Sequence, residues 1–223
     1  MRVLVTGGSG FVASHCPEGR SLVESFAGIP DKRLSFVIVE DIAVPGAFDD
    51  AVDQEPPLDA VLHTASPFRF DIADLKKDLI DPAIMGTEGL LRSVMLKGKS
   101  VRRVVITSSF AAMSRDGNHP EVYNESHWSG LTMDQALSGH PFTAYKASKQ
   151  FAEEAAWAFM KSERSHFELT TLTPPVVFGP ILHTPDASIQ SIRPVRVCSH
   201  LSAENAKVVW SRRLSSYGLT YGT

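Results

Sequence analysis

Short runs of apolar residues alternate along the chain with longer segments in which polar and apolar residues are mixed. The apolar runs lie at residues 2–6, 34–41, 60–66, 101–109 and 166–180. Apolar, β-branched runs of this length that end at glycine, proline or small polar residues are typical of buried strands. Strands that alternate with longer mixed segments predict parallel β-α-β units, and therefore an α/β, doubly wound parallel sheet.

Two of the mixed segments have a helical composition. Residues 142–161 are rich in Ala, Glu and Lys and contain neither Gly nor Pro, which predicts an uninterrupted helix. Residues 72–97 predict a second helix, interrupted near Asp81 and Pro82 because proline lacks the backbone N–H that an inner helical turn needs. Each segment follows an apolar run, as a strand-helix unit requires.

Small residues, most of them bearing a hydroxyl, stand where four of the predicted strands end. These ends are Thr6-Gly7, Thr64-Ala65-Ser66, Thr107-Ser108-Ser109 and Thr173-Pro174. In a doubly wound sheet, ligands bind in the crevice beyond the carboxyl ends of the parallel strands. We therefore expect these residues to line one ligand site.

A glycine-rich turn follows the first predicted strand. Gly7, Gly10 and Ala13 give the pattern G-x-x-G-x-x-A. Glycine permits a tight turn and a close approach of the backbone to a pyrophosphate, and the start of the following helix offers unpaired N–H groups. An ordinary strand-to-helix turn fits the same pattern, but its position after the first strand favours a dinucleotide site.

Tyr145 and Lys149 are four residues apart in the predicted helix, so they share one of its faces. Such pairs are common on exposed helices, and the spacing alone is weak evidence for catalysis. Ser109 is expected to hydrogen-bond a substrate carbonyl oxygen to which Tyr145 donates a proton. We expect Lys149 to lower the pKa of Tyr145 from about 10 and to hold the ribose of a nicotinamide cofactor. Together with the glycine-rich turn, the three residues favour a catalytic site.

Composition and charge narrow the classes of partner. The formal net charge is −3, which favours neither nucleic-acid binding nor a polybasic contact with a membrane. The first apolar run is too short for a signal peptide or a membrane span, so we expect a cytoplasmic protein. Cys16 and Cys198 predict neither a metal cluster nor a disulfide framework. His63 is expected to be structural, and no histidine spacing indicates a metal site.

The motifs TGGSGFVASH, VVITSSFAAM, YKASK and TPPVVFGP together resemble those of extended short-chain dehydrogenase/reductases. The resemblance covers residues 1 to about 180. It is closest to the dihydroflavonol reductase, cinnamoyl-CoA reductase and fungal ketone and aldehyde reductase branch of the NAD-dependent epimerase/dehydratase superfamily. It implies a Rossmann fold and NADPH, more than NADH, as the cofactor. The implied reaction reduces a ketone or aldehyde, a small-molecule carbonyl substrate, to an alcohol, with Ser109, Tyr145 and Lys149 as catalytic residues.

The same resemblance implies which residues surround the cofactor. Asp41 and Ile42 would flank the adenine, Thr64 to Ser66 would pass the phosphates and ribose, and Pro174 to Val177 would border the nicotinamide. The implied cofactor-binding residues are Gly7, Gly10, Phe11, Val12, Asp41, Ile42, Thr64, Ala65, Ser66, Tyr145, Lys149, Pro174 and Val177.

The chain departs from the family pattern in two places. The sequence Pro-Glu-Gly at 17–19 interrupts the first helix, and we interpret 34–41 as the strand that follows a missing β-α unit. In the competing interpretation, 34–41 is the family's second strand and Asp41 is the ribose-binding acid of an NAD enzyme. The chain is also expected to lack most of the family's C-terminal substrate region, because the residues after Ile192 show no family motif. We therefore expect 1–180 to form an NAD(P)-binding domain and 181–223 to be a remnant or altered substrate-binding region.

Two alternatives to a carbonyl reductase remain open at this point. A nucleotide-sugar epimerase or dehydratase shares the fold and the three catalytic residues. A truncated, non-catalytic pseudoenzyme fits the departures from the family pattern. The sequence determines neither the substrate nor the oligomeric state.

Overall fold

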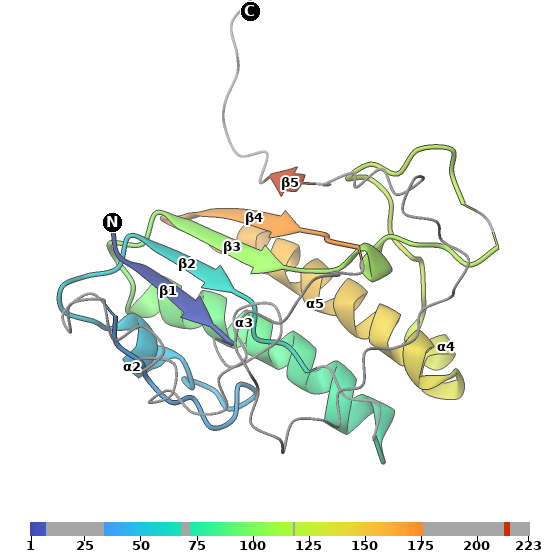
Figure 1. The fold of residues 1–223 in the computed structure, drawn as a ribbon, viewed down its shortest axis with the longest axis horizontal. Helices are drawn as coiled ribbons and strands as arrows, with labels where there is room; N and C mark the ends of the chain where they lie inside the picture. The colour runs from blue at the N-terminus through green and yellow to red at the C-terminus, as the bar shows by residue number, and fades with distance from the viewer. Residues whose placement is uncertain (8–33, 68–71, 118, 176–211, 215–223) are drawn as a thin grey trace, which may run out of the picture.

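Five strands form one sheet in the computed structural model, which describes residues 1–7, 34–67, 72–117, 119–175 and 212–214. Their order across the sheet is β1 (Val3–Thr6), β2 (Ala60–His63), β3 (Arg103–Thr107), β4 (Glu168–Leu172) and β5 (Arg212–Leu214). Strands β1 to β4 are parallel, and β5 pairs antiparallel with β4 (Figure 1). The carboxyl ends of four parallel strands therefore lie at one edge, and the predicted α/β sheet is confirmed.

Helices of the described residues cover one face of this sheet (Figure 1). The two long helices are α3 (Asp81–Leu96) and α5 (Pro141–Ser162), which pack against each other. The shorter helical elements are α2 (Asp49–Val52), η1 (Lys76–Ile80), η2 (Phe110–Ala112) and α4 (Met133–Ser138).

The start and the composition of α5 explain why this helix forms. Pro141 occupies its first turn, where the missing N–H costs no hydrogen bond, and Nδ1 of His140 accepts from the N–H of Phe142 at 3.2 Å. The predicted segment 142–161 has no helix breaker, and the helix runs one residue further at each end. Its prediction is confirmed, and Tyr145 and Lys149 do lie on one continuous helix.

The apolar core lies between the sheet and the two long helices. Val61, Val104 and Leu169 alternate with outward-facing residues on their strands and are at most 1% exposed. They pack in one cluster with Leu90 of α3 and Phe159 of α5. The same face turns polar toward the carboxyl ends of the strands, and the buried residues there are Thr6, His63, Ser108 and Thr171. The candidate site therefore rests on a rigid apolar base.

The prediction of a strand at 34–41 is wrong. Residues 34–39 have no regular structure, and the side chains of Phe36, Val37 and Ile38 are 41%, 46% and 74% exposed. A strand needs hydrogen bonds from a neighbour, and in the described part of the chain β1 pairs only with β2. The apolar pattern alone could not supply that neighbour. Residues 17–19, on which the interrupted first helix was inferred, lie outside the described residues.

The helix predicted at 72–97 is confirmed in type, but its predicted interruption is wrong. The π-helical turn η1 passes directly into α3 at Asp81, and Pro82 occupies the first turn of α3. A proline is tolerated there because no inner-turn N–H is required of it. The change from π-helix to α-helix therefore accommodates the proline without interrupting the helical segment.

Candidate active site

Ser109 stands where β3 gives way to the short turn η2. Its backbone is still extended, with φ −155° and ψ 149°, and its hydroxyl accepts a hydrogen bond from the N–H of Ala111 at 3.1 Å. The next N–H, of Phe110, donates to the carbonyl of Pro174 at 2.9 Å. Ser109 is therefore held between its own turn and the chain that leaves β4.

Tyr145 and Lys149 reach Ser109 from α5. The side chains of Ser109 and Tyr145 are hydrogen-bonded to each other. The ammonium of Lys149 lies 5.8 Å from the centre of the Tyr145 ring. Tyr145 is half-buried, and Lys149 is only 9% exposed. The structure thus brings together the three residues predicted to be catalytic, although they are separated in sequence and come from two elements.

Burial controls the ionisation of both α5 residues. It raises the pKa of Tyr145 above its ordinary value of 10.0, and the hydrogen bond with Ser109 offsets this only in part. It lowers the pKa of Lys149 from 10.5 to about 8. The expectation of a lowered Tyr145 pKa is wrong for this structure, because the loss of water around the phenol is the largest contribution.

The end of β1 packs tightly against the end of β2. Gly7 has φ +70°, and a Cβ atom there would lie 2.7 Å from the backbone nitrogen of Ala65. The hydroxyl of Thr64 donates to the carbonyl of Thr6 at 2.5 Å, and the N–H of Ala65 donates to the Thr6 hydroxyl at 3.3 Å. Only glycine fits this conformation and this space without strain. Of the predicted cofactor residues, Gly7, Thr64 and Ala65 are therefore brought together at one strand end, with Ser66 following in the same loop.

The remaining predicted cofactor residues are less closely grouped. Asp41 turns its carboxylate back to accept from the N–H of Ala43 at 2.8 Å. Ile42 packs under Gly86 of α3, where an added Cβ would lie 2.8 Å from its side chain. The carbonyl of Pro174 accepts from the N–H of Phe110, the residue that follows Ser109. Four predicted residues lie outside the described part of the chain: Gly10, Phe11, Val12 and Val177.

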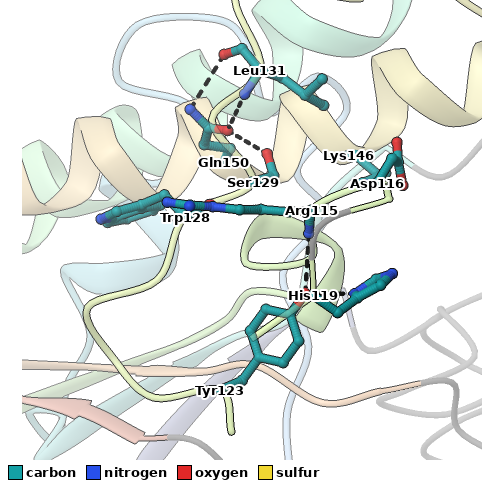
Figure 2. A network of polar contacts seen from close by, with 9 residues as sticks. All are labelled: Arg115, Asp116, His119, Tyr123, Trp128, Ser129, Leu131, Lys146 and Gln150. Atoms are coloured by element: carbon teal, nitrogen blue, oxygen red, sulfur yellow. Dashed lines mark hydrogen bonds and ion pairs between the residues drawn. The ribbon is translucent and has the colours of Figure 1, made fainter. Parts of the chain in front are cut away.

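A loop between η2 and α4 is fastened to the site helix by Gln150 (Figure 2). The side-chain oxygen of Gln150 accepts from the N–H of Leu131 at 3.1 Å and from the hydroxyl of Ser129. Its amide nitrogen donates to the carbonyl of Leu131 at 3.4 Å and to Glu154 at 2.9 Å. Gln150 thus pairs with Leu131 much as a neighbouring strand would.

The same loop is tied to α5 again beside Tyr145 (Figure 2). Lys146, whose side chain is 3% exposed, forms an ion pair of 2.7 Å with Asp116. Within the loop, the N–H of Arg115 donates to the hydroxyl of Tyr123 at 3.2 Å, and its guanidinium donates to the carbonyl of Trp128 at 3.0 Å. Lys146 and Gln150, which directly follow Tyr145 and Lys149 on α5, therefore hold the loop that borders the site.

Sequence reasoning missed Glu153, which lies under the site. This carboxylate is 1% exposed and accepts hydrogen bonds from Ser108 at 2.5 Å, Thr171 at 2.8 Å and Trp157 at 3.4 Å. The spacing of Tyr145, Lys149 and Glu153, each four residues after the last, was the available signal. It places an acid on the buried face of the helix, where an acid requires partners.

Two features of the described residues concern other classes of protein. No helix of the described part of the chain is long and apolar enough to cross a membrane. No group of three or more His, Cys, Asp or Glu side chains in that part is arranged to hold a metal ion.

Comparison with known proteins places the chain in a family. Residues 3–221 match the NAD dependent epimerase/dehydratase family. The ketoreductase azaE of Aspergillus niger is 44% identical over 197 residues, which is 80% of this chain and 58% of that protein. The NADPH-dependent methylglyoxal reductase GRE2 of Saccharomyces cerevisiae is 36% identical over 233 residues, which is 92% of this chain and 67% of that protein.

Solved structures give the same relationship. The crystal structure of Gre2 from Candida albicans in complex with NADPH superposes with a TM-score of 0.76 at 35% identity, covering 82% of this chain and 60% of that one. The chain thus spans about three fifths of the length of these relatives. The match of sequence and of fold confirms the Rossmann fold and the resemblance inferred from the motifs. The chain belongs to the NAD-dependent epimerase/dehydratase family.

Proposed function

We propose that this chain reduces a ketone or aldehyde to an alcohol with NADPH as the hydride donor. The observation that carries the proposal is the hydrogen bond between Ser109 and Tyr145, beside the buried ammonium of Lys149. The proposal is supported by two relatives, which are named as a ketoreductase and as an NADPH-dependent methylglyoxal reductase.

In the proposed reaction, the hydroxyls of Ser109 and Tyr145 both donate hydrogen bonds to the substrate's carbonyl oxygen. These bonds draw electrons from the carbonyl carbon and stabilise the negative charge that develops on the oxygen. Tyr145 then gives its proton to that oxygen as the alcohol forms. Its raised pKa keeps the phenol protonated near neutral pH, which suits a proton donor. The ammonium of Lys149 favours the tyrosinate that remains.

The surroundings of Lys149 fit a nicotinamide cofactor. Among the described residues, no hydrogen bond or ion pair holds this buried ammonium. A buried cation without partners is costly, and ribose hydroxyls would supply oxygen acceptors for it. NADPH, when bound, supplies the hydride that the carbonyl carbon accepts. The described residues proposed to hold it are Gly7, Asp41, Ile42, Thr64, Ala65, Ser66, Tyr145, Lys149 and Pro174.

The two segments expected from the sequence are proposed to have different roles. Residues 1–180 would bind the cofactor and supply the catalytic groups, and residues 181–223 would contribute to the substrate side. Strand β5, from the second segment, adds to the edge of the sheet next to β4. That pairing supports a second segment built onto the first.

The proposal is tested by comparing the wild-type chain with Tyr145→Phe. NADPH consumption is followed by absorbance with a panel of ketones and aldehydes, and NADPH binding is followed by fluorescence. We expect the variant to lose at least about a hundredfold in kcat, which is the lower range for general acid catalysis, while its Kd for NADPH stays within about twofold.

Turnover by Tyr145→Phe at the wild-type rate would contradict the assigned role. Binding of NADPH without turnover by the wild-type chain would instead favour the non-catalytic alternative. A redox-neutral epimerase or dehydratase would consume no NADPH but would convert a nucleotide sugar, so adding such sugars to the panel separates that alternative.

A further inference from the structure

Glu153 is buried at the point where three elements meet. It lies on α5, and its donors are Ser108 at the end of β3, Thr171 in β4 and Trp157 one turn further along α5. The two hydroxyl bonds are short, at 2.5 Å and 2.8 Å. A carboxylate with 1% exposure is stable only when such donors satisfy it. The carboxylate therefore fixes α5 relative to two strands of the sheet.

Ser108 and Ser109 bind α5 at two separate points. Ser108 reaches Glu153, and Ser109 reaches Tyr145, eight residues earlier on the same helix. At a rise of 1.5 Å per residue, the two helix positions are about 12 Å apart. Consecutive residues in extended backbone direct their side chains to different sides, so holding one of them sets the direction of the other.

The backbone of this strand end is held independently. The N–H of Ser108 donates to the carbonyl of Leu172 at 2.8 Å, and the N–H of Phe110 donates to the carbonyl of Pro174 at 2.9 Å. These bonds fix the distance of β3 from β4 but do not involve α5. Among the contacts described for Ser108, only the hydroxyl bond to Glu153 ties it to the helix that carries Tyr145.

We propose that Glu153 is a positioning residue that aligns Ser109 with Tyr145 by holding the hydroxyl of Ser108. The inference rests on the proposed function, because alignment of Ser109 with Tyr145 matters for catalysis only if both hydroxyls act on one carbonyl oxygen. The described donors of the Glu153 carboxylate are Ser108, Thr171 and Trp157, which are not proposed to act on the substrate. Its effect passes through one hydrogen bond to β3.

Two substitutions separate positioning from simple stabilisation. Ser108→Ala and Thr171→Val each remove one hydroxyl from the same carboxylate, with little change in shape. A merely stabilising Glu153 predicts that both variants lower the melting temperature and behave alike at the site. A positioning Glu153 predicts that only Ser108→Ala disturbs Ser109 and Tyr145, because Thr171 contacts the carboxylate from β4.

The first measurement is the ionisation of Tyr145, which needs no turnover. Tyrosinate absorbance is recorded against pH, and the Tyr145→Phe curve is subtracted. The Ser109 hydrogen bond lowers the Tyr145 pKa, so its loss in Ser109→Ala gives the full upward shift. We expect Ser108→Ala to give at least half of that shift and Thr171→Val to give less than a quarter. Equal shifts in the two variants, or none in Ser108→Ala, would overturn the proposal.

The second measurement is kinetic, with substitutions of Glu153 itself. Glu153→Gln keeps one oxygen acceptor and adds an amide N–H2 that can donate to a serine hydroxyl. It should therefore retain most of kcat. Ser108→Ala should lower kcat about tenfold or more while the KM for NADPH stays within twofold. Glu88→Ala, at an exposed position of α3, is the matched control for Glu153→Ala and should leave both constants unchanged. If the wild-type chain shows no turnover, the proposed function fails while the titration still decides the positioning role.

Discussion

At the scale of single residues, His63 illustrates how burial changes chemistry. Its side chain is 2% exposed at the end of β2, where Nδ1 lies 2.7 Å from the hydroxyl of Thr6 and the ring meets Phe48 edge-on. Among the described residues, its Nε2 atom has no hydrogen-bond partner. Burial, with a smaller contribution from the charge of Lys149, lowers the pKa of His63 from 6.5 to about 3. The imidazole is therefore neutral in the folded protein at pH 5 and above.

This lowered pKa predicts an acid-sensitive fold. The folded pKa lies below the unfolded value of 6.5, so the contribution of His63 to stability is complete above pH 6.5 and falls as the pH drops toward about 3. Between pH 7.5 and pH 5.0 the free energy of unfolding should fall by about 2 kcal/mol through His63. Urea denaturation at the two pH values measures it. His63→Asn, which keeps an atom facing Thr6, should lack this part of the fall, while His119→Asn at an exposed position should retain it. An equal fall in all three proteins would refute the assignment to His63.

At the scale of elements, α5 holds the site together from two sides. One side carries Tyr145, Lys149 and Glu153. Another side carries Lys146 and Gln150, which contact the loop that precedes α4 (Figure 2). Among the described residues, no strand pairs with the loop along this contact, and side chains of α5 satisfy its backbone groups instead. The conformation of this loop therefore depends on its contacts with α5.

Replacing Gln150 by alanine should destabilise the protein at this contact. The change leaves the N–H and the carbonyl of Leu131 without the partners that Gln150 supplies, which should cost about 2 kcal/mol of unfolding free energy. Amide exchange of Leu131 should rise as well. Gln54→Ala is the matched control, because the side chain of Gln54 donates only to the nearby carbonyl of Asp50 in α2 and is partly exposed. The prediction is wrong if the two variants lose the same stability, or if exchange at Leu131 does not change.

At the scale of the whole molecule, one apolar cluster joins the sheet to both long helices. Leu90 of α3 is fully buried in it, together with Val61 and Val104 of the sheet and Phe159 of α5. Strands β2, β3 and β4 each contribute a buried residue to this cluster, and Leu4 of β1 packs against it. The spacing of the site residues should therefore be lost when the cluster loosens.

Leu90→Ala should lower the free energy of unfolding by about 2 to 5 kcal/mol, because it leaves a cavity in this cluster. The matched control is Leu96→Ala in the same helix, whose side chain is 59% exposed, and its effect should be within about 0.5 kcal/mol. Denaturant titration measures both, and NADPH fluorescence at low denaturant reports whether the site is lost in the same transition. Comparable losses in the two variants would contradict the placement of the core.

The sequence by itself determined the features that depend on local pattern. The runs at 2–6, 60–66, 101–109 and 166–180 contain the four parallel strands, and 142–161 contains most of α5, because period, propensity and breakers are local properties. The convergence of Thr64 and Ser109 at one edge followed from the parallel order. The grouping of Ser109, Tyr145 and Lys149 followed from the motif and from that order together.

Only the tertiary structure decided what depends on distant neighbours. The apolar run at 34–41 is not a strand, since strand formation needs a partner that a local pattern does not reveal. The Tyr145 pKa is raised rather than lowered, because burial is a property of the packed fold. Glu153 bonds to Ser108 and Thr171, which are 45 and 18 residues away in the chain. Hydrogen bonding and desolvation act over a few ångströms in space, and the sequence records only separation along the chain.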